Sequence, residues 1–291
     1  MTRGLFVTNI IKATHLEGLL KKSGVINLLR RVNNYNACKQ ARAFFAKNQD
    51  NIKKILSFLS DDASIKTYSE VAQRRKDYYY DFSNILCTEN QYLIDKVLTS
   101  IRLPQNTEAI FMDCGAYNGD TVETFINSVP DFGAIYAFEP DPANCNEITK
   151  KFEGKSNVYV ENWGVWSQKD TLFFNSSQLG SSKVTSKETF DDNKNIISIN
   201  VNCIDSLNVH GKIFIKMDIE GSEQEALKGA ETTIRNEKPI LAICIYHSDD
   251  DYVKIPLWIH DIYGNDADYY VRHHSADYSE TVFYAVPHCW L

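Results

Sequence analysis

From residue 108 onward, short runs of apolar residues alternate with longer segments in which apolar residues recur every three or four positions. Short apolar runs are typical of buried strands, and the longer pattern is typical of helices with one buried face. Strands that alternate with helices predict a mainly parallel sheet covered on both faces. The expected strands are 109–112, 134–138, 157–160, 213–217 and 240–246, with a closing hairpin at 269–272 and 281–286, an added hairpin at 172–174 and 197–201 around a mobile loop at 175–195, and helices at 120–128, 141–152, 222–236 and 253–262.

The first 105 residues follow a different pattern. Leu, Ile and Val recur at intervals of three and four through residues 1–60, with Lys and Arg on the other faces, which predicts amphipathic helices. A further helix is expected at 90–101, before Pro104. The aromatic run at 78–82 suits packing between domains or a wall on which a sugar or base stacks. We therefore expect a mainly helical, basic accessory region at 1–105 and a catalytic domain at 106–291.

Charge divides the chain at nearly the same place. The net charge is −7, but residues 1–107 carry 17 Lys and Arg against 9 Asp and Glu, whereas residues 108–291 carry 14 against 29. The basic region suits helix faces that dock on the acidic half, or peripheral contact with an anionic partner such as a nucleotide sugar or a membrane surface. The acidic half argues against a phosphate backbone, so nucleic acid is not an expected partner. The sequence is also compatible with an oligomer.

Seven cysteines are scattered along the chain without a C-x-x-C pair. Scattered cysteines in odd number are typical of a reducing compartment rather than of a disulfide framework. Lys12 and His15 interrupt the first apolar stretch, unlike in a signal peptide. No window approaches the roughly 20 apolar residues of a membrane span. We therefore expect a cytoplasmic protein without a transmembrane segment.

The loop after the first expected strand carries the first candidate chemistry. In an open parallel sheet, ligands bind beyond the carboxyl ends of the strands. Gly115 and Gly119 let the backbone approach a ligand where a side chain would collide, although a simple turn between strand and helix would also explain them. The expected cofactor residues of this loop are Asp113, Gly115, Ala116, Tyr117, Asn118, Gly119, Asp120 and Thr121.

Glu139 ends the second expected strand, 24 residues beyond Gly115, where a carboxylate accepts the hydroxyl groups of a ribose. That geometry serves nicotinamide cofactors and S-adenosylmethionine alike. The pyrophosphate loop Gly-x-Gly-x-x-Gly is absent, and the carboxylates of Asp113 and Asp120 suit a cationic sulfonium better than a pyrophosphate. S-adenosylmethionine is therefore the expected cofactor, and its further expected contacts are Pro140, Gly164 and Val165.

From about residue 108 to 287 the chain resembles the FkbM family of O-methyltransferases. The resemblance rests on the segments 110–121, 135–142, 213–223, 226–230, 245–247 and 272–275. It implies an α/β fold with a Rossmann-like class I methyltransferase sheet, mainly parallel with an antiparallel last strand. It also implies a hydroxyl group, often on a sugar or a polyketide, as the methyl acceptor. Residues 1–105 lie outside the resemblance.

Four side chains at the carboxyl ends of the fourth and fifth expected strands are catalytic candidates: Lys216, Asp218, Glu220 and His247. Methyl transfer depends on placing the reacting atoms in line, and a hydroxyl oxygen needs a base or a metal to lose its proton. His247 has the best intrinsic pKa for that base, although a structural histidine also suits its position. Asp218 suits the amino group of the cofactor, a base or a cation ligand. Asp218, His247 and Asp249 lack a recognised metal signature, so no metal is expected.

His273 is a further catalytic candidate. It is adjacent to His274 on an expected strand, so the two side chains point to opposite faces and only one enters the site. Arg272 shares a face with His274 and suits either a phosphate-bearing acceptor or a surface position.

These features predict an S-adenosylmethionine-dependent O-methyltransferase that acts on a hydroxyl of a carbohydrate or glycan precursor. The alternatives are a non-catalytic S-adenosylmethionine-binding module, a methyltransferase with another small-molecule or nucleic-acid acceptor, and a dinucleotide oxidoreductase. Enzymes that methylate amino groups of nucleic acids often carry Asn/Asp-Pro-Pro-Tyr/Phe after the fourth strand. This chain has Asp218-Ile219-Glu220-Gly221 there.

Overall fold

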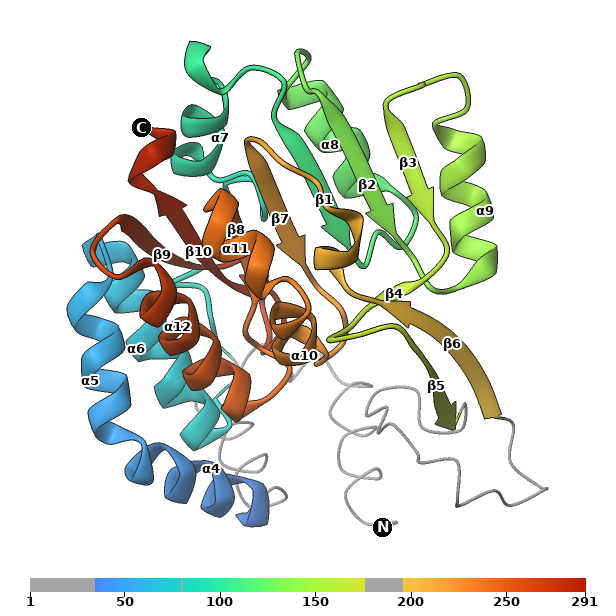
Figure 1. The fold of residues 1–291 in the computed structure, drawn as a ribbon. Coiled ribbons are helices and arrows are strands. Elements are labelled where there is room, and N and C mark those ends of the chain that lie inside the picture. The colour runs from blue at the N-terminus through green and yellow to red at the C-terminus, as the bar shows by residue number, and fades with distance from the viewer. Residues whose placement is uncertain (1–34, 80, 176–195) are drawn as a thin grey trace, which may run out of the picture.

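The protein is built around a seven-stranded sheet, shown in Figure 1 as a computed structural model. The structure describes residues 35–79, 81–175 and 196–291. The strands lie in the order β3-β2-β1-β7-β8-β10-β9, and only β10 runs antiparallel to its neighbours. The strands are β1 (Ile110–Cys114), β2 (Ala134–Phe138), β3 (Val158–Glu161), β7 (Ile213–Met217), β8 (Ile240–Cys244), β9 (Ala267–His273) and β10 (Thr281–Pro287).

Helices cover both faces of this sheet, because successive strand residues point to opposite sides. Along β1, Met112 belongs to a hydrophobic core shared with α5, α6 and α12, whereas Phe111 belongs to a second core shared with α7 and α8. The sheet is therefore the middle of three layers. The helices are α4 (Tyr35–Lys47), α5 (Gln49–Phe58), α6 (Asp62–Asp77), α7 (Asp95–Ile101), α8 (Asp120–Ser128), α9 (Pro142–Lys151), α10 (Glu223–Lys228), α11 (Glu231–Glu237) and α12 (Asp249–Tyr263).

A smaller sheet follows β3, with the order β4 (Gly164–Val165), β6 (Ile196–Asn202) and β5 (Asp170–Asn175). β5 and β6 pair antiparallel, as expected for the added hairpin. The expected mobile loop between them lies almost wholly outside the described residues.

The order and direction of the main strands agree with the sequence, including the antiparallel hairpin at the end. The helix expected at 222–236 is instead two helices, α10 and α11, which meet at Gly229. A Cβ on Gly229 would stand 2.0 Å from the carbonyl oxygen of Trp166, so the chain bends where two backbones touch. The helix expected from residue 90 begins only at Asp95. α6 was not expected, because polar residues such as Ser64, Thr67 and Arg74 fill much of its buried face.

The helices before residue 105 pack on the same core as the sheet. Asp61 caps α6 through the Ser64 N–H at 2.7 Å and forms an ion pair with Arg272 of β9 at 2.7 Å. Tyr68 of α6 stacks on Tyr252 of α12, with 4.4 Å between the ring centroids, and donates a hydrogen bond to its carbonyl. Figure 1 shows α5 and α6 beside β9 and α12, with α4 packed against α6. The domain boundary at residue 105 stays a prediction.

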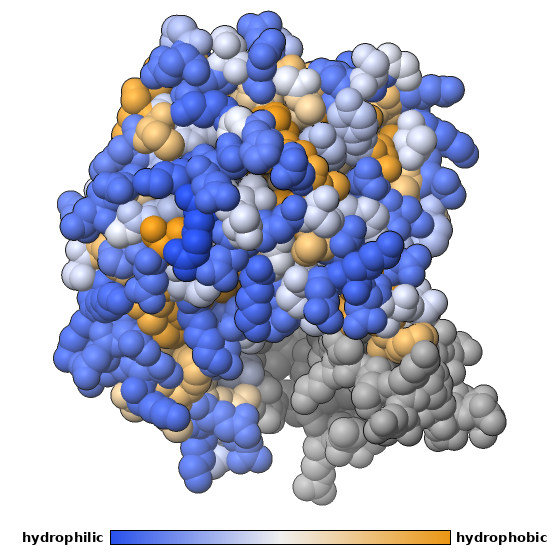
Figure 2. Space-filling model, viewed as in Figure 1, coloured by the Kyte–Doolittle hydropathy of each residue, from blue (hydrophilic) through white to orange (hydrophobic). Residues whose placement is uncertain are grey.

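Hydrophilic residues cover most of the face seen in Figure 2, with small hydrophobic areas between them. Within the described ranges, no helix combines the length and the apolar character that a membrane crossing requires. All seven cysteines lie in those ranges and are free.

A buried ion pair joins β1 to β7 at the centre of the sheet. Asp113 and Lys216 are directly paired in the register of the two strands, and the Nζ of Lys216 lies 2.9 Å from Oδ1 of Asp113. Their side chains are 0% and 3% exposed. Burial alone would lower the pKa of Lys216, but the carboxylates of Asp113 and Asp218 raise it above its ordinary value, so the amine is charged.

His273, at the end of β9, is also fully buried. Its ring stacks on Phe82 with 4.4 Å between centroids, and its Nδ1 lies 2.8 Å from Oγ1 of Thr281. Burial lowers the pKa of His273 to about 4, so the ring is neutral in the folded protein.

Breaking the buried pair should destabilise the protein strongly. Lys216→Met leaves the Asp113 carboxylate buried without its partner, which costs about 3–5 kcal/mol of unfolding free energy. The double variant Asp113→Asn with Lys216→Met removes both charges and should lose less than Lys216→Met alone. Urea denaturation of the wild type, Lys216→Met and the double variant measures this, and a double variant that loses as much as Lys216→Met or more would contradict the pairing.

His273 should make stability depend on pH. As the pH falls below about 6.5, the unfolded chain binds the proton first, so stability from the neutral ring is lost progressively down to about pH 4, by about 3 kcal/mol in total. His273→Gln should lessen the fall of unfolding free energy between these values, and the part that remains comes from His274, whose pKa burial also lowers to about 4. The exposed His210→Gln should leave the fall unchanged. Equal pH profiles for the two variants would contradict this assignment.

Candidate functional site

The carboxyl ends of β1, β2, β7 and β8 lie along one edge of the sheet, because these strands are parallel. Gly115 follows β1 with a φ of +83°, and a Cβ there would stand 2.0 Å from the carbonyl oxygen of Asp218. Gly119 has a φ of +73° and precedes α8. Glycine is thus required at both positions, and the loop from β1 lies directly against the residue that follows β7.

Lys216 also contacts the loop that follows β1. Besides its pair with Asp113, its Nζ donates to the Gly115 carbonyl at 2.7 Å. Asp113 and Lys216 are both enclosed and are paired with each other. The expected roles of Asp113 at the cofactor and of Lys216 in catalysis stay predictions, and beyond this pair the structure gives Lys216 a hydrogen bond to the loop after β1.

Glu139 follows β2 and is 7% exposed. Its Oε2 accepts the Tyr117 N–H at 2.8 Å and its Oε1 accepts the Asp141 N–H at 2.9 Å. Burial raises the pKa of Glu139, and these two backbone groups lower it in part. Each carboxylate oxygen keeps a lone pair, so Glu139 can still accept hydrogen bonds from a ligand.

The other residues of the loop divide into inner and outer positions. Ala116 is buried, whereas Tyr117 is 62% exposed and has a left-handed φ of 48°, which turns its N–H toward Glu139. Asp120 is exposed and accepts the N–H of Thr121 at 2.7 Å, so its carboxylate caps its own helix. Asn118 accepts the N–H of Asp120 at 3.1 Å.

The residues expected after the third strand lie in the smaller sheet. Gly164 and Val165 form β4 and pair with β6. A Cβ on Gly164 would lie 3.7 Å from Pro140, which places this strand beside the end of β2. Val165 is 3% exposed and packs in the core, so of the two only Gly164 reaches the edge of the sheet.

Asp218 is the centre of a polar group after β7. Its Oδ2 accepts the hydroxyl of Tyr92 and its Oδ1 accepts the hydroxyl of Tyr246, both at 2.9 Å. The Nε2 of His247 lies 3.5 Å from the same Oδ1. Two of the catalytic candidates, Asp218 and His247, are therefore brought together.

His247 lies among three carboxylates. Its Nδ1 is 3.2 Å from Glu223, and its Nε2 is 3.7 Å from Glu220 in addition to its contact with Asp218. Burial lowers the pKa of His247, but these carboxylates raise it above its ordinary value of 6.5. Glu220 is 88% exposed and borders this group from the solvent side.

His273 is not part of this group. The stacking on Phe82 and the full burial described above leave no part of its ring open to an acceptor. Arg272 pairs with Asp61, and His274 contacts the hydroxyl of Tyr284 at 3.0 Å. The structure places His273 apart from Asp218 and His247, because β9 lies beyond β10 and its end is covered by the chain after α6. The expected catalytic role of His273 stays a prediction.

Three residues of the site were missed from the sequence: Tyr92, Glu223 and Tyr246. Tyr246 directly precedes His247, and Glu223 lies four residues from Ile219, whose N–H it accepts at 2.9 Å. Both stand in segments that already pointed to the site. Tyr92 comes from the region before residue 105, and no local pattern connects it to Asp218.

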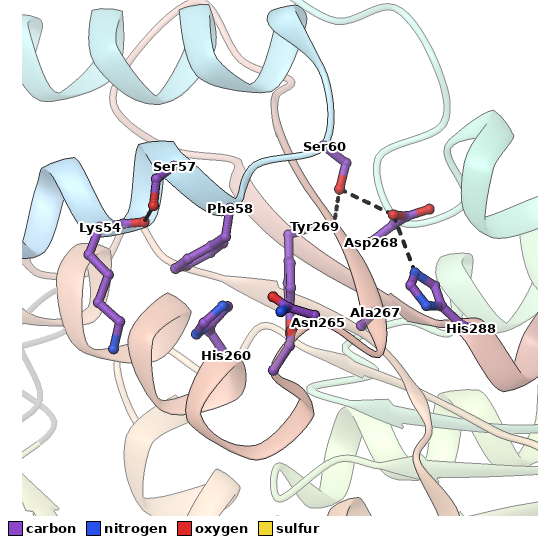
Figure 3. A pocket seen from close by; sticks show the side chains of 11 residues that line it. Lys54, Ser57, Phe58, Ser60, His260, Asn265, Ala267, Asp268, Tyr269 and His288 are labelled. Atoms are coloured by element: carbon purple, nitrogen blue, oxygen red, sulfur yellow. Dashed lines mark hydrogen bonds and ion pairs between the residues drawn. The ribbon is translucent and has the colours of Figure 1, made fainter.

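A separate pocket of about 460 Å³ lies between α5, α12 and the amino end of β9. Figure 3 shows Phe58 stacked on His260, and Asp268 between Ser60 and His288. Because Ala267 begins β9, this pocket is at the opposite end of the strands from Glu139 and Asp218. It adjoins none of the candidate site residues.

Comparison with solved structures gives similar folds. The FkbM methyltransferase of Methylobacillus flagellatus is 24% identical, with a TM-score of 0.65 over 84% of this chain, which spans 60% of that protein's length. An rRNA methylase from Streptococcus thermophilus is 11% identical, with a TM-score of 0.41 over 69% of this chain and 98% of its own. A putative methyltransferase of Streptococcus mutans in complex with SAH is 12% identical, with a TM-score of 0.40 over 69% and 99%.

A search of curated proteins found no match. The family model of the methyltransferase FkbM domain matches residues 113–271, more than half of the chain. The sheet order and the reversed β10 are those of a Rossmann-like methyltransferase. The matched residues begin at the loop that follows β1 and include both Asp218 and His247. The chain therefore belongs to the FkbM methyltransferase family.

Proposed function

We propose that the protein transfers a methyl group from S-adenosylmethionine to a hydroxyl group of a carbohydrate or glycan precursor. The observation that carries the proposal is the contact between Gly115 and Asp218. It brings the loop that follows β1 against the polar group that contains Asp218 and His247. Methyl transfer needs the two binding sites to be adjacent, because the sulfur, the methyl carbon and the acceptor oxygen must lie in line.

The residues at this edge fit the cofactor. Glu139 would accept the ribose hydroxyl groups, and the backbone of Gly115 to Gly119 would lie along the rest of the molecule. Pro140 and Gly164 stand beside Glu139 and would border the adenine. When bound, S-adenosylmethionine supplies an electrophilic methyl group.

The polar residues around Asp218 fit a methyl acceptor that carries many hydroxyl groups. Asp218, Glu220 and Glu280 offer carboxylates, and Gln91 bonds to Glu280 next to Tyr92. Carboxylates and amides accept and donate hydrogen bonds to sugar hydroxyl groups, whereas their charge would repel a phosphodiester backbone. An acceptor hydroxyl beside Asp218 and His247 would lose its proton to this group.

Glu139→Ala should weaken cofactor binding. The change removes the acceptor of the ribose hydroxyl groups, and loss of hydrogen bonds to a charged group corresponds to about a 10- to 100-fold rise in the Kd for S-adenosylmethionine. Isothermal titration calorimetry measures this Kd, with thermal melts to verify folding and the exposed Glu153→Ala as the control. An unchanged Kd would remove Glu139 from the ribose site.

Asp218→Asn and His247→Ala should each lower turnover about 100-fold or more while the cofactor Kd changes little, because they act on the acceptor. Labelled S-adenosylmethionine with a panel of nucleotide sugars and glycan extracts gives the rates and the products, and His210→Ala is the histidine control. Methyl ethers are the expected products. Methylated nitrogen atoms, or cofactor binding with no transfer to any acceptor, would overturn the proposal.

A further inference from the structure

Asp218, Glu223 and His247 come close enough to share one ion. One ligand atom from each lies within 4.8 Å of the others, and the group contains two carboxylates and one imidazole. The three residues follow β7, begin α10 and follow β8, so they converge from separate elements.

Glu223 gives independent evidence for a ligand. Its side chain is 0% exposed, and its Oε1 accepts the Ile219 N–H. Its Oε2 has no hydrogen-bond partner among the described residues, and neither do the two ring nitrogens of His247. The contacts of 3.2 and 3.5 Å around the ring are close, but their directions are not those of hydrogen bonds. A buried carboxylate oxygen without a donor is expensive unless a cation satisfies it.

The surroundings hold these side chains in place. Tyr92 and Tyr246 donate to the two oxygens of Asp218, and the backbone of Ile219 fixes Glu223. Between them, Gly221 has a φ of +90° and a Cβ there would lie 3.5 Å from His247. Donors of this kind around the ligands are typical of metal sites, where they orient the ligating atoms.

We propose that Asp218, Glu223 and His247 bind a divalent first-row metal ion, Mn²⁺ or Zn²⁺. One imidazole with two carboxylates suits these ions better than Mg²⁺ or Ca²⁺, which prefer oxygen alone. Two carboxylates and a neutral histidine balance a charge of +2. The sequence predicted no metal, and its weaker candidate ligand Asp249 is instead paired with Arg75 at 2.8 Å.

The metal site adds a catalytic role to the proposed function, and that role rests on the proposed function. A hydroxyl bound to a divalent cation has a lowered pKa, so its O–H bond breaks more easily. The proton passes to water beside the exposed Glu220, and the oxygen keeps the electron pair with which it attacks the methyl group. In this arrangement His247 is a ligand and not the base.

The test is metal binding by the full chain after dialysis against EDTA. Calorimetry with MnCl₂ and with ZnCl₂ should give one equivalent for the wild type, and Glu223→Gln should bind about 10-fold more weakly or not at all. Glu237→Gln is the matched control, because Glu237 also contacts a histidine, His210 at 2.8 Å, but on the surface. If Glu223→Gln does not fold, Asp218→Asn replaces it.

Binding of less than a tenth of an equivalent of both ions, or equal binding by wild type and Glu223→Gln, would overturn the metal site. So would full hydroxyl methylation in excess EDTA, and in that case the proposed function stands with His247 as base. Binding of one equivalent of metal by the wild type and its loss in Glu223→Gln support the metal site. This holds even if no hydroxyl acceptor is methylated and the proposed function fails.

Discussion

The ion pair between Asp113 and Lys216 is the interaction on which the site depends. It joins the two central strands where both are fully buried, so water cannot replace either partner. The same Lys216 amine donates to the Gly115 carbonyl and thereby fixes the loop that follows β1. Gly115 in turn lies against the carbonyl of Asp218, which leaves no room for a side chain. The position of Asp218 relative to the loop that follows β1 therefore depends on this ion pair.

The region before residue 105 takes part in this arrangement. Tyr92 reaches Asp218, and its ring lies 5.0 Å from the Lys216 amine. Arg75 of α6 pairs with Asp249 and donates to the carbonyl of Tyr246, next to His247. The helices that cover β9 thus also position the residues at the end of β8. The basic charge of this region is used at least in part inside the protein.

The sequence was most informative where one local pattern decides the structure. The strands β2 and β7 and the helix α8 have the expected bounds, because an apolar run or an amphipathic repeat is a property of neighbouring residues. The need for glycine at positions 115 and 119 was equally predictable. Contacts with a distant partner were not predictable, because the sequence does not show that Lys216 pairs with Asp113 or that His273 stacks on Phe82. Tyr92 and Glu223 needed the fold to bring them to Asp218.

A crystal structure of the protein with S-adenosylhomocysteine tests the central claim most directly, namely that the loop held by Lys216 is where the cofactor binds. The ribose hydroxyl groups are expected within hydrogen-bonding distance of Glu139, and the sulfur is expected on the side of Asp218. A ligand bound at the amino end of β9, between Phe58 and His288, or a fully bound ligand without contact to Glu139 or Gly115, would contradict it.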